Sequence, residues 1–199
     1  TGGATSGALT MNDGTLINAG SGTISLGADE NIALGGLLTT NTSATAVTLT
    51  SAEGGITDAG DGVVDVVTAS GTLVIDAVTG VDIDTTVGSL DLDNATSGNV
   101  AIAETNDITV AKAVQATAGN ISIAAAGGTI TLDSGGSPAN VVSAVGTGTI
   151  SIDANGASSD IVVNDGISSA SGDITLTADN DVIFAAEGDI VSTSGNVAV

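Results

Sequence analysis

Short runs of alternating apolar and polar residues recur along the whole chain. In the segment 172–184, GDITLTADNDVIF, a glycine and one polar residue precede the apolar positions Ile174 and Leu176, and a second apolar pair, Val182 and Phe184, follows eight residues later. The same 13-residue pattern occurs without gaps at 22–34, 71–83 and 98–110. Alternation with a period of two is typical of β-strands, so each copy predicts two short strands joined by a polar turn.

The first apolar position of this pattern can be followed through eight repeats, at Ile24, Val47, Leu73, Val100, Ile121, Ile150, Ile174 and Val197. A second apolar pair begins at Ile32, Ile56, Val81, Ile108, Ile130, Ile161 and Val182, and a third apolar position recurs before the next repeat, for example at Ile17, Val66, Val114, Ile167 and Ile190. The first positions lie 21 to 29 residues apart. A period of this length is typical of solenoids, because one repeat cannot bury its apolar face alone.

The pattern therefore predicts an all-β protein, a three-sided parallel β-helix (β-solenoid) of about eight coils with roughly 25 residues each. We expect the eight first positions to stack in one internal ladder. Nothing resembling a linker divides the chain, so residues 1–199 are interpreted as a single β-solenoid domain. Because the sequence starts in mid-pattern and stops on an apolar repeat position, we expect it to be a segment of a longer or assembled chain.

A pair of β-sandwich modules is the competing fold, since its strands would also recur every 8–12 residues. Such a core normally contains large aromatic side chains. This chain has one aromatic residue, Phe184, and 29 glycines among 199 residues. A core without aromatic residues needs regular, narrow layers, which favours the solenoid.

Charge excludes several classes of partner. The formal net charge is −22, and Lys112 is the only basic residue. We therefore expect no binding to nucleic acid and no membrane insertion, because there is no cationic surface for phosphates and no apolar run of 18 residues. Copies of the chain should repel one another unless cations screen them, so self-association, end to end or lateral, should depend on such screening.

Catalysis is not expected. Polysaccharide-cleaving β-helices need basic residues or paired carboxylates beside aromatic residues that stack on sugars. The sequence has no Arg, His, Tyr or Trp, and Lys112 stands between two alanines. We predict that the protein is not an enzyme and has no cofactor, with calcium as the one possible exception.

Calcium is the metal that suits carboxylate and amide oxygens. The candidate ligands are Asp82, Asp84, Asp91 and Asp93, with two further clusters at Asp58, Asp61 and Asp65 and at Asp179, Asn180 and Asp181. The alternative is that these carboxylates simply lie on the solvated face of a strand. Polar residues before the second apolar pair, at Asn31, Asp107, Asp160 and Asp181, are interpreted as Asx turns that bond their own backbone.

An ice-binding face would require a clean ladder of outward threonines. The outward positions read Ser25, Thr48, Val74, Ala101, Ser122, Ser151, Thr175 and Ala198. This series is mixed, so ice binding stays a minor alternative.

The segments 119–133, 148–154 and 172–199, with their Gly-polar-Ile-x-Leu repeats, resemble the adhesin repeats of filamentous-haemagglutinin-type large bacterial exoproteins. The resemblance implies a right-handed β-helix, an extracellular or cell-surface location, and a role in adhesion or surface structure, with host or surface glycans as possible partners. We therefore expect a structural or adhesive segment of a secreted bacterial surface or filament-forming protein, acting as a rigid rod that stacks end to end. A calcium-, glycan- or ice-binding extracellular module is the alternative.

Overall fold

The computed structural model describes residues 7–60, 63–136 and 140–199. These residues form 23 β-strands and no helix, and the strands divide into two parallel sheets. Sheet A has 12 strands: β1 (Leu9–Thr10), β2 (Leu16–Asn18), β4 (Ile32–Leu34), β5 (Gly36–Leu38), β7 (Ile56–Asp58), β8 (Val66–Val67), β10 (Val81–Thr86), β12 (Val100–Glu104), β14 (Ile121–Ala125), β17 (Ile150–Ala154), β20 (Ile174–Ala178) and β23 (Val197–Ala198).

Sheet B has the remaining 11 strands: β3 (Ile24–Ala28), β6 (Val47–Ser51), β9 (Thr72–Ala77), β11 (Ser89–Asn94), β13 (Ile108–Gln115), β15 (Ile130–Leu132), β16 (Asn140–Ala144), β18 (Ile161–Val163), β19 (Gly166–Ser169), β21 (Val182–Phe184) and β22 (Ile190–Ser192).

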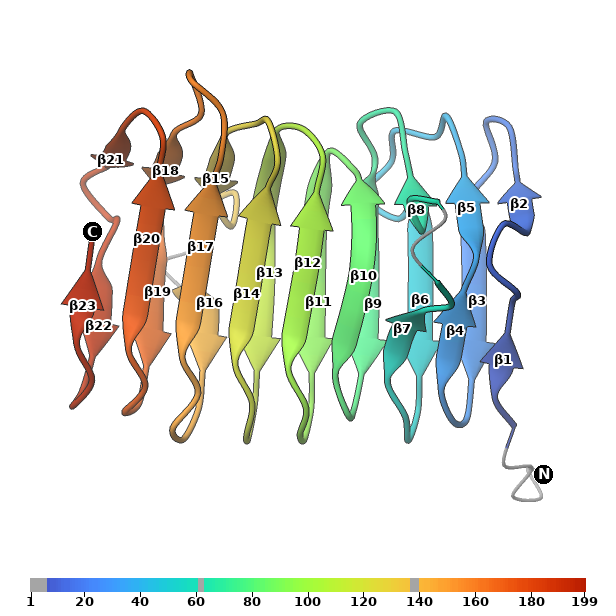
Figure 1. Cartoon of the computed structure of the whole chain (residues 1–199), viewed down its shortest axis with the longest axis horizontal. Helices are drawn as coiled ribbons and strands as arrows, with labels where there is room; N and C mark the ends of the chain where they lie inside the picture. Colours follow the sequence, from blue (N-terminus) through green and yellow to red (C-terminus); the bar gives the residue numbers. More distant parts are fainter. Residues whose placement is uncertain (1–6, 61–62, 137–139) are drawn as a thin grey trace.

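The chain winds as a parallel β-solenoid of about eight turns, with about 23 residues from one turn to the next. In Figure 1 it runs upward through sheet A on the near side and downward through sheet B on the far side, while it advances from the N-terminus at the right to the C-terminus at the left. This combination makes the coil right-handed, the usual hand of parallel β-crossovers. The predicted all-β parallel solenoid is therefore confirmed.

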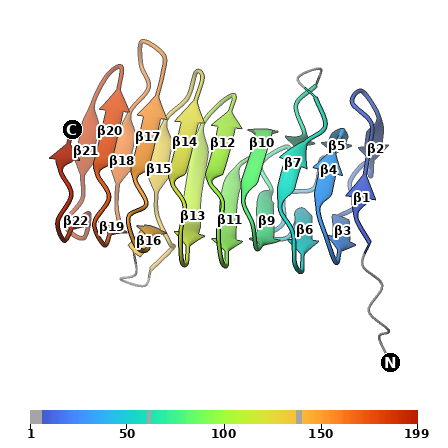
Figure 2. The same cartoon turned by 60° about the horizontal axis from the view of Figure 1, so that its bottom comes forward.

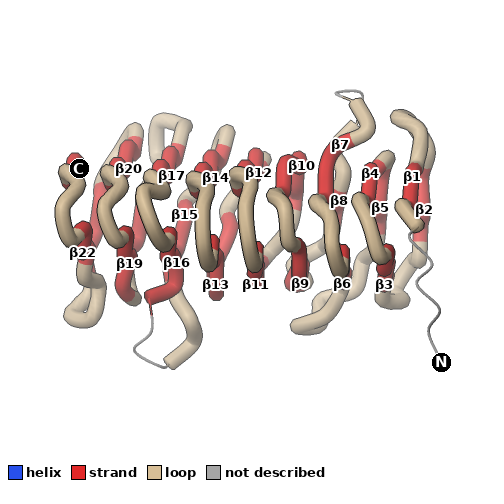
Figure 3. The backbone as a smooth tube through the Cα atoms, turned by 90° about the horizontal axis from the view of Figure 1, so that it is seen from below, coloured by secondary structure: helices blue, strands red, loops and turns tan. Residues whose placement is uncertain are grey.

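The number of strands in a turn changes along the rod. In the first three turns sheet A is split into two short strands per turn, so that β2, β5 and β8 form a second row that follows the row of β1, β4 and β7 along the strand direction. In the last three turns sheet B is split instead, and β16, β19 and β22 form a separate row (Figure 2). The turns between them have two longer strands each. Turns with three strands thus occur toward both ends of the rod, but the split sheet is sheet A at the N-terminal end and sheet B at the C-terminal end. The coils line up along one straight axis (Figure 3).

The prediction that the eight first positions stack in a single ladder is wrong, because the series changes from sheet B to sheet A between Leu73 and Val100. Ile24, Val47 and Leu73 do stack on one another, but they lie in sheet B. Val100 and the four later positions stack in sheet A, where Val100 pairs with Val81, the second apolar position of the preceding repeat. Leu73 pairs instead with Leu90. From Leu73 to Val100 the chain therefore makes one and a half turns rather than one.

The reason is that the 13-residue pattern describes an arch of two strands facing each other across the core. In the copies at 22–34 and 71–83 the first strand lies in sheet B and the second in sheet A, whereas at 98–110 and 172–184 the order is reversed. Both sheets need the same inward alternation of apolar residues, so the pattern looks identical in either arrangement.

The core fills the narrow space between the sheets with stacked aliphatic side chains. Buried residues come from the strands between β3 and β20, as at Ile121, Ile123 and Ala125 of β14, which repeat at Ile150, Ile152 and Ala154 of β17. Because each layer repeats the one before it, side chains of one shape fill the space without aromatic residues.

A column of glycines marks the corner that leads into the later part of sheet A. A Cβ atom on Gly119, Gly148, Gly172 or Gly195 would overlap the carbonyl oxygen of the preceding glycine in the column, which begins at Gly98. Gly98 and Gly119 also have positive φ values, of 82° and 141°. The other three do not, so close approach of successive coils, and not a left-handed backbone, requires glycine there.

Candidate functional site

The four predicted calcium ligands lie on two different sheets. Asp82 and Asp84 belong to β10 of sheet A, and Asp91 and Asp93 belong to β11 of sheet B. These sheets form opposite sides of the coil (Figure 1), so the structure does not bring the four carboxylates together. Each pair alternates with buried residues, such as Ile83 and Leu92, and therefore lies on the outward side of its strand.

Asp93 forms an ion pair with Lys112 on the neighbouring strand β13. In register, Asp91 lies opposite Lys112 and Asp93 lies opposite Asp76, so the single basic side chain stands among three carboxylates. The hydrogen bond from Lys112 to Asp93 raises the pKa of the lysine, and the charges of Asp93, Asp91 and Asp76 act in the same direction. Lys112 thus neutralises part of a local acidic patch.

A second group of carboxylates gathers where the chain leaves sheet A between β7 and β8. Asp65 is fully buried, and its Oδ2 accepts a hydrogen bond of 2.8 Å from the backbone N–H of Asp84. Burial, together with the neighbouring charges of Asp58 and Asp84, raises the pKa of Asp65 to about 8 despite that hydrogen bond. Asp61, the third member of the predicted Asp58–Asp61–Asp65 cluster, lies outside the described residues.

Corner residues bond the next coil rather than their own backbone. The side-chain oxygen of Asn31 accepts the N–H of Gly55, that of Asp107 accepts the N–H of Thr129, and that of Asp160 accepts the N–H of Asp181, at 2.8–3.0 Å. The predicted Asx turns at these positions are therefore wrong. In a solenoid the equivalent residue of the next coil is the nearest donor, being only one strand spacing away.

The predicted cluster Asp179–Asn180–Asp181 takes part in the same kind of bonding. Asp179 Oδ2 accepts the N–H of Gly156 at 2.8 Å, and the Asn180 amide donates to Asp160 at 2.7 Å. These groups connect consecutive coils at the surface. Within the part of the chain that the structure describes, no group of three or more acidic side chains is arranged to hold a metal ion.

Buried polar side chains were not anticipated from the sequence, and Glu104, Asn94 and Gln115 are the largest uncharged or acidic examples that bond across coils. Glu104 accepts hydrogen bonds from Thr85 and from the backbone N–H groups of Val87 and Thr105, at 2.8–3.1 Å, while burial raises its pKa. Asn94 donates to Gln115 in the adjacent coil and accepts the N–H of Gly80. The strand alternation does indicate that these side chains face inward, because Glu104 and Asn94 each stand two residues after an inward apolar residue.

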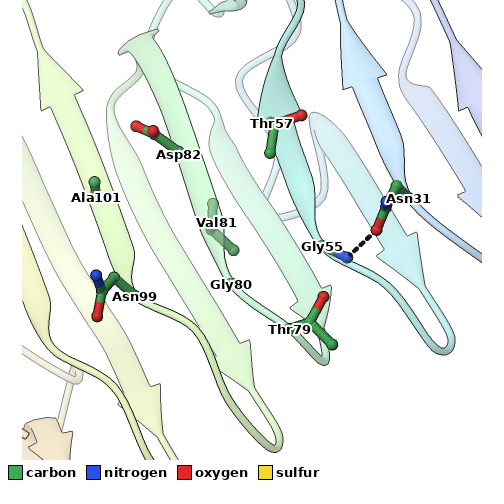
Figure 4. A pocket seen from close by; sticks show the side chains of 9 residues that line it. All are labelled: Asn31, Gly55, Thr57, Thr79, Gly80, Val81, Asp82, Asn99 and Ala101. Carbon is green, nitrogen blue, oxygen red and sulfur yellow. Dashed lines mark hydrogen bonds between the residues drawn. The ribbon is translucent and has the colours of Figure 1, made fainter.

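A shallow groove of about 460 Å³ lies on sheet A at the edge of the early coils. Figure 4 shows Asn31 and Asn99 at its two ends, with Gly55 and Gly80 between them and Asp82 and Thr57 on the strands above. Because glycine has no side chain, the surface is hollow at Gly55 and Gly80. A Cβ on Gly55 would approach the carbonyl oxygen of Gly80 to 2.9 Å, so crowding between coils already explains why glycine stands there.

The outward series considered for ice binding is divided between the sheets. Ser25, Thr48 and Val74 lie on sheet B and are followed there by Asp91. The positions from Ala101 to Ala198 lie on sheet A, where Asp82 precedes them. Neither face presents an uninterrupted threonine ladder in the described strands.

Comparisons with known proteins leave the fold and the surface as the only guides to function. No protein-family model, no curated protein and no solved structure matches the chain. Over residues 7–60, 63–136 and 140–199, no helix is long and apolar enough to span a membrane.

Proposed function

We propose that this chain is a rigid structural rod within a secreted or surface-attached bacterial protein, serving as a stalk, filament or adhesive segment. The observation that carries the proposal is the unbroken stacking of parallel strands from β1 to β23 in sheet A, with sheet B running beside it from β3 to β21. A continuous ladder resists bending, because each coil is hydrogen-bonded to the coils before and after it.

Open edges support extension of the rod. Among the described strands, β1 pairs only with β4 and β23 pairs only with β20, so the outer edge of each can accept another parallel strand. Apolar side chains are also exposed in the coils nearest each edge, including Leu16 and Ile17 at one end and Phe184 and Val197 at the other. A further coil, from the same polypeptide or from a second copy, would bury them.

The architecture can be tested in solution by small-angle scattering and circular dichroism on the purified chain. We expect a β-dominated spectrum and a rod about 40 Å long, from eight steps at the spacing of adjacent strands. A spectrum dominated by helix, or the scattering profile of a compact sphere, would contradict the proposal.

Glycan binding is a second candidate, and the groove of Figure 4 favours it. The side-chain oxygens of Asn31 and Asn99 accept the backbone N–H groups of Gly55 and Asn120. Their amide nitrogens donate to none of the described residues, which leaves these donors for a ligand. Together with Asp82 they offer donors and acceptors for sugar hydroxyls. The carboxylate favours a neutral glycan over an acidic one.

Screening an array of neutral and sialylated glycans with the unchanged chain and with Asp82→Asn tests this candidate. We expect binding of neutral glycans that Asp82→Asn weakens at least about tenfold, as loss of one charged hydrogen bond would do. Thr175→Ala, on the same sheet but away from the groove, should bind like the unchanged chain. If Asp82→Asn binds neutral glycans as tightly as the unchanged chain, the groove is not the glycan-binding site.

A further inference from the structure

The two ends of the rod expose open strand edges on opposite sheets. At the N-terminal end these are β1 and β2 of sheet A and β3 of sheet B, and among the described strands each pairs only with the next coil. At the C-terminal end they are β21 and β22 of sheet B and β23 of sheet A, each paired only with the coil before it. The side with two strand edges is therefore sheet A at one end and sheet B at the other.

The main rows of the two sheets differ by one strand. The row from β1 to β23 in sheet A contains nine strands, and the row from β3 to β21 in sheet B contains eight. A second copy stacked on the C-terminal end in the same orientation would place its β1 on β23. Its β3 would then lie two strand spacings from β21. Sheet B would have a gap at the junction, where backbone groups lack hydrogen-bond partners.

Turning the second copy by half a turn about the rod axis removes this gap. In Figure 1 sheet A runs upward on the near side and sheet B downward on the far side, so the rotation exchanges the two sheets and keeps neighbouring strands parallel. Strands β1 and β2 of the second copy then continue β21 and β22, and its β3 continues β23. Each of these junctions spans one strand spacing of about 4.8 Å.

The inward apolar residues of the two end coils fit this arrangement, because both sets are spaced by eight residues and then by seven. They are Val182, Ile190 and Val197 at the C-terminal end and Leu9, Ile17 and Ile24 at the N-terminal end. Each residue of the first set would stack on the corresponding residue of the second. Phe184, which is 46% exposed, would lie on Met11, a flexible side chain that packs well against an aromatic ring. The core would thus continue through the junction.

A hydrogen bond between corners can also continue through the junction. Asp160 Oδ1 accepts the N–H of Asp181 at 3.0 Å. Asp181 stands immediately before β21, as Asp160 stands immediately before β18, so its carboxylate would accept the N–H of Ala8, immediately before β1. In the same register Asp189 lies opposite Leu16. Neither carboxylate is placed directly opposite another one.

We propose that the C-terminal end of the rod binds the N-terminal end of a second copy that is turned by half a turn about the rod axis. The inference rests on the structural role proposed above and names the partner of the open ends. The contact is head-to-tail and does not close on itself, so repeated addition builds a straight filament. Each copy adds about 40 Å, between eight and nine strand spacings. Successive copies present opposite sheets on the same side of the filament.

Disulfide cross-linking between two singly substituted chains tests the orientation, because the sequence contains no cysteine. In the proposed register the exposed Ala198 of one copy lies opposite Ser25 of the next, whereas stacking without the rotation places it opposite Thr10. The test uses 500 mM NaCl to screen the like charges. We expect Ala198→Cys mixed with Ser25→Cys to form linked dimer at least about tenfold faster than Ala198→Cys mixed with Thr10→Cys, since only the first pair comes within disulfide reach. Equal or reversed rates would overturn the proposal.

Sedimentation velocity of Val197→Glu and Val191→Glu in the same salt tests the contact itself. Val197 is 47% exposed and becomes buried against Ile24 of the second copy, whereas Val191 lies on the outward face of β22 and stays in solvent. We expect Val197→Glu to lose association and Val191→Glu to associate like the unchanged chain, with circular dichroism checking that both stay folded. Equal association of the two variants, or an unchanged chain that stays monomeric at every salt concentration, would refute the contact. Such a monomer that still scatters as a rod about 40 Å long would leave the structural role standing.

Discussion

Lys112 is the only basic residue of the sequence, and it lies among carboxylates on the outward face of sheet B. In the sequence it stands between two alanines, with no acidic residue beside it. The structure places Lys112 inside strand β13, where it lies opposite Asp91 in register and its ammonium group contacts Asp93. Strand register, which the sequence alone does not define, decides that these groups meet.

We expect Lys112→Met to lower the free energy of unfolding by less than about 1 kcal/mol, because the side chains of both ion-pair partners are roughly 40% exposed to solvent. The loss should be larger in 20 mM than in 500 mM NaCl, since salt screens the charges left behind. Denaturant unfolding at the two salt concentrations measures this effect. Lys112→Arg, which keeps the charge, is the control, and a salt-independent loss of several kcal/mol in Lys112→Met would contradict the prediction.

At the scale of the element, the corner glycines matter more than any ion pair. The column from Gly98 to Gly195 brings the backbones of successive coils so close that a Cβ at most of these positions would overlap a carbonyl oxygen. The chain bends at the Ser-Gly pairs 171–172 and 194–195. Gly98 and Gly119 of this column have positive φ values, but Gly172 does not.

Gly172→Ala should destabilise the fold by about 2–4 kcal/mol, because the new methyl group can be accommodated only by separating two coils. Gly27→Ala is the matched control. Gly27 is exposed in strand β3, and its nearest neighbour to a new Cβ is the Thr50 carbonyl oxygen at 3.9 Å, so the change should stay within about 0.5 kcal/mol. Thermal and denaturant unfolding of the two variants measures the difference, and equal stabilities would show that the corner relaxes freely.

At the scale of the whole molecule, a net charge of −22 opposes the association that the exposed apolar end residues favour. The acidic side chains are spread over both sheets rather than collected in one cluster. Screening should therefore depend on ionic strength and not on the identity of one cation.

Sedimentation velocity at rising NaCl concentration should show increasing association of the chain. MgCl₂ and CaCl₂ at equal ionic strength should act alike, because diffuse screening does not distinguish them. Association that weakens as salt is added to a low-salt solution would contradict the repulsion argument. A response to calcium alone would instead indicate a specific site.

Much of the fold was predictable from the sequence because strand alternation is a local property. The inward residues, the turns and the parallel stacking follow from the apolar period of two and its return about every 25 residues, as at Ile121 and Ile150. The same reasoning also anticipated a core without aromatic side chains, since repeated layers need only one kind of aliphatic residue.

Only the tertiary structure decided which side of the coil each strand occupies. The arch of 13 residues has the same pattern whichever sheet its first strand joins. The additional half-turn that the chain makes between Leu73 and Val100 is therefore not visible in the apolar periodicity. Asp82 and Asp91 lie on opposite sheets, and the pairing of β8 with β10 places Asp65 beside Asp84. The alternation of apolar and polar residues determines whether a side chain faces the core or the solvent. Hydrogen bonding between successive coils determines which side chains become neighbours. The candidate sites depend on those neighbours, so only the tertiary structure defines them.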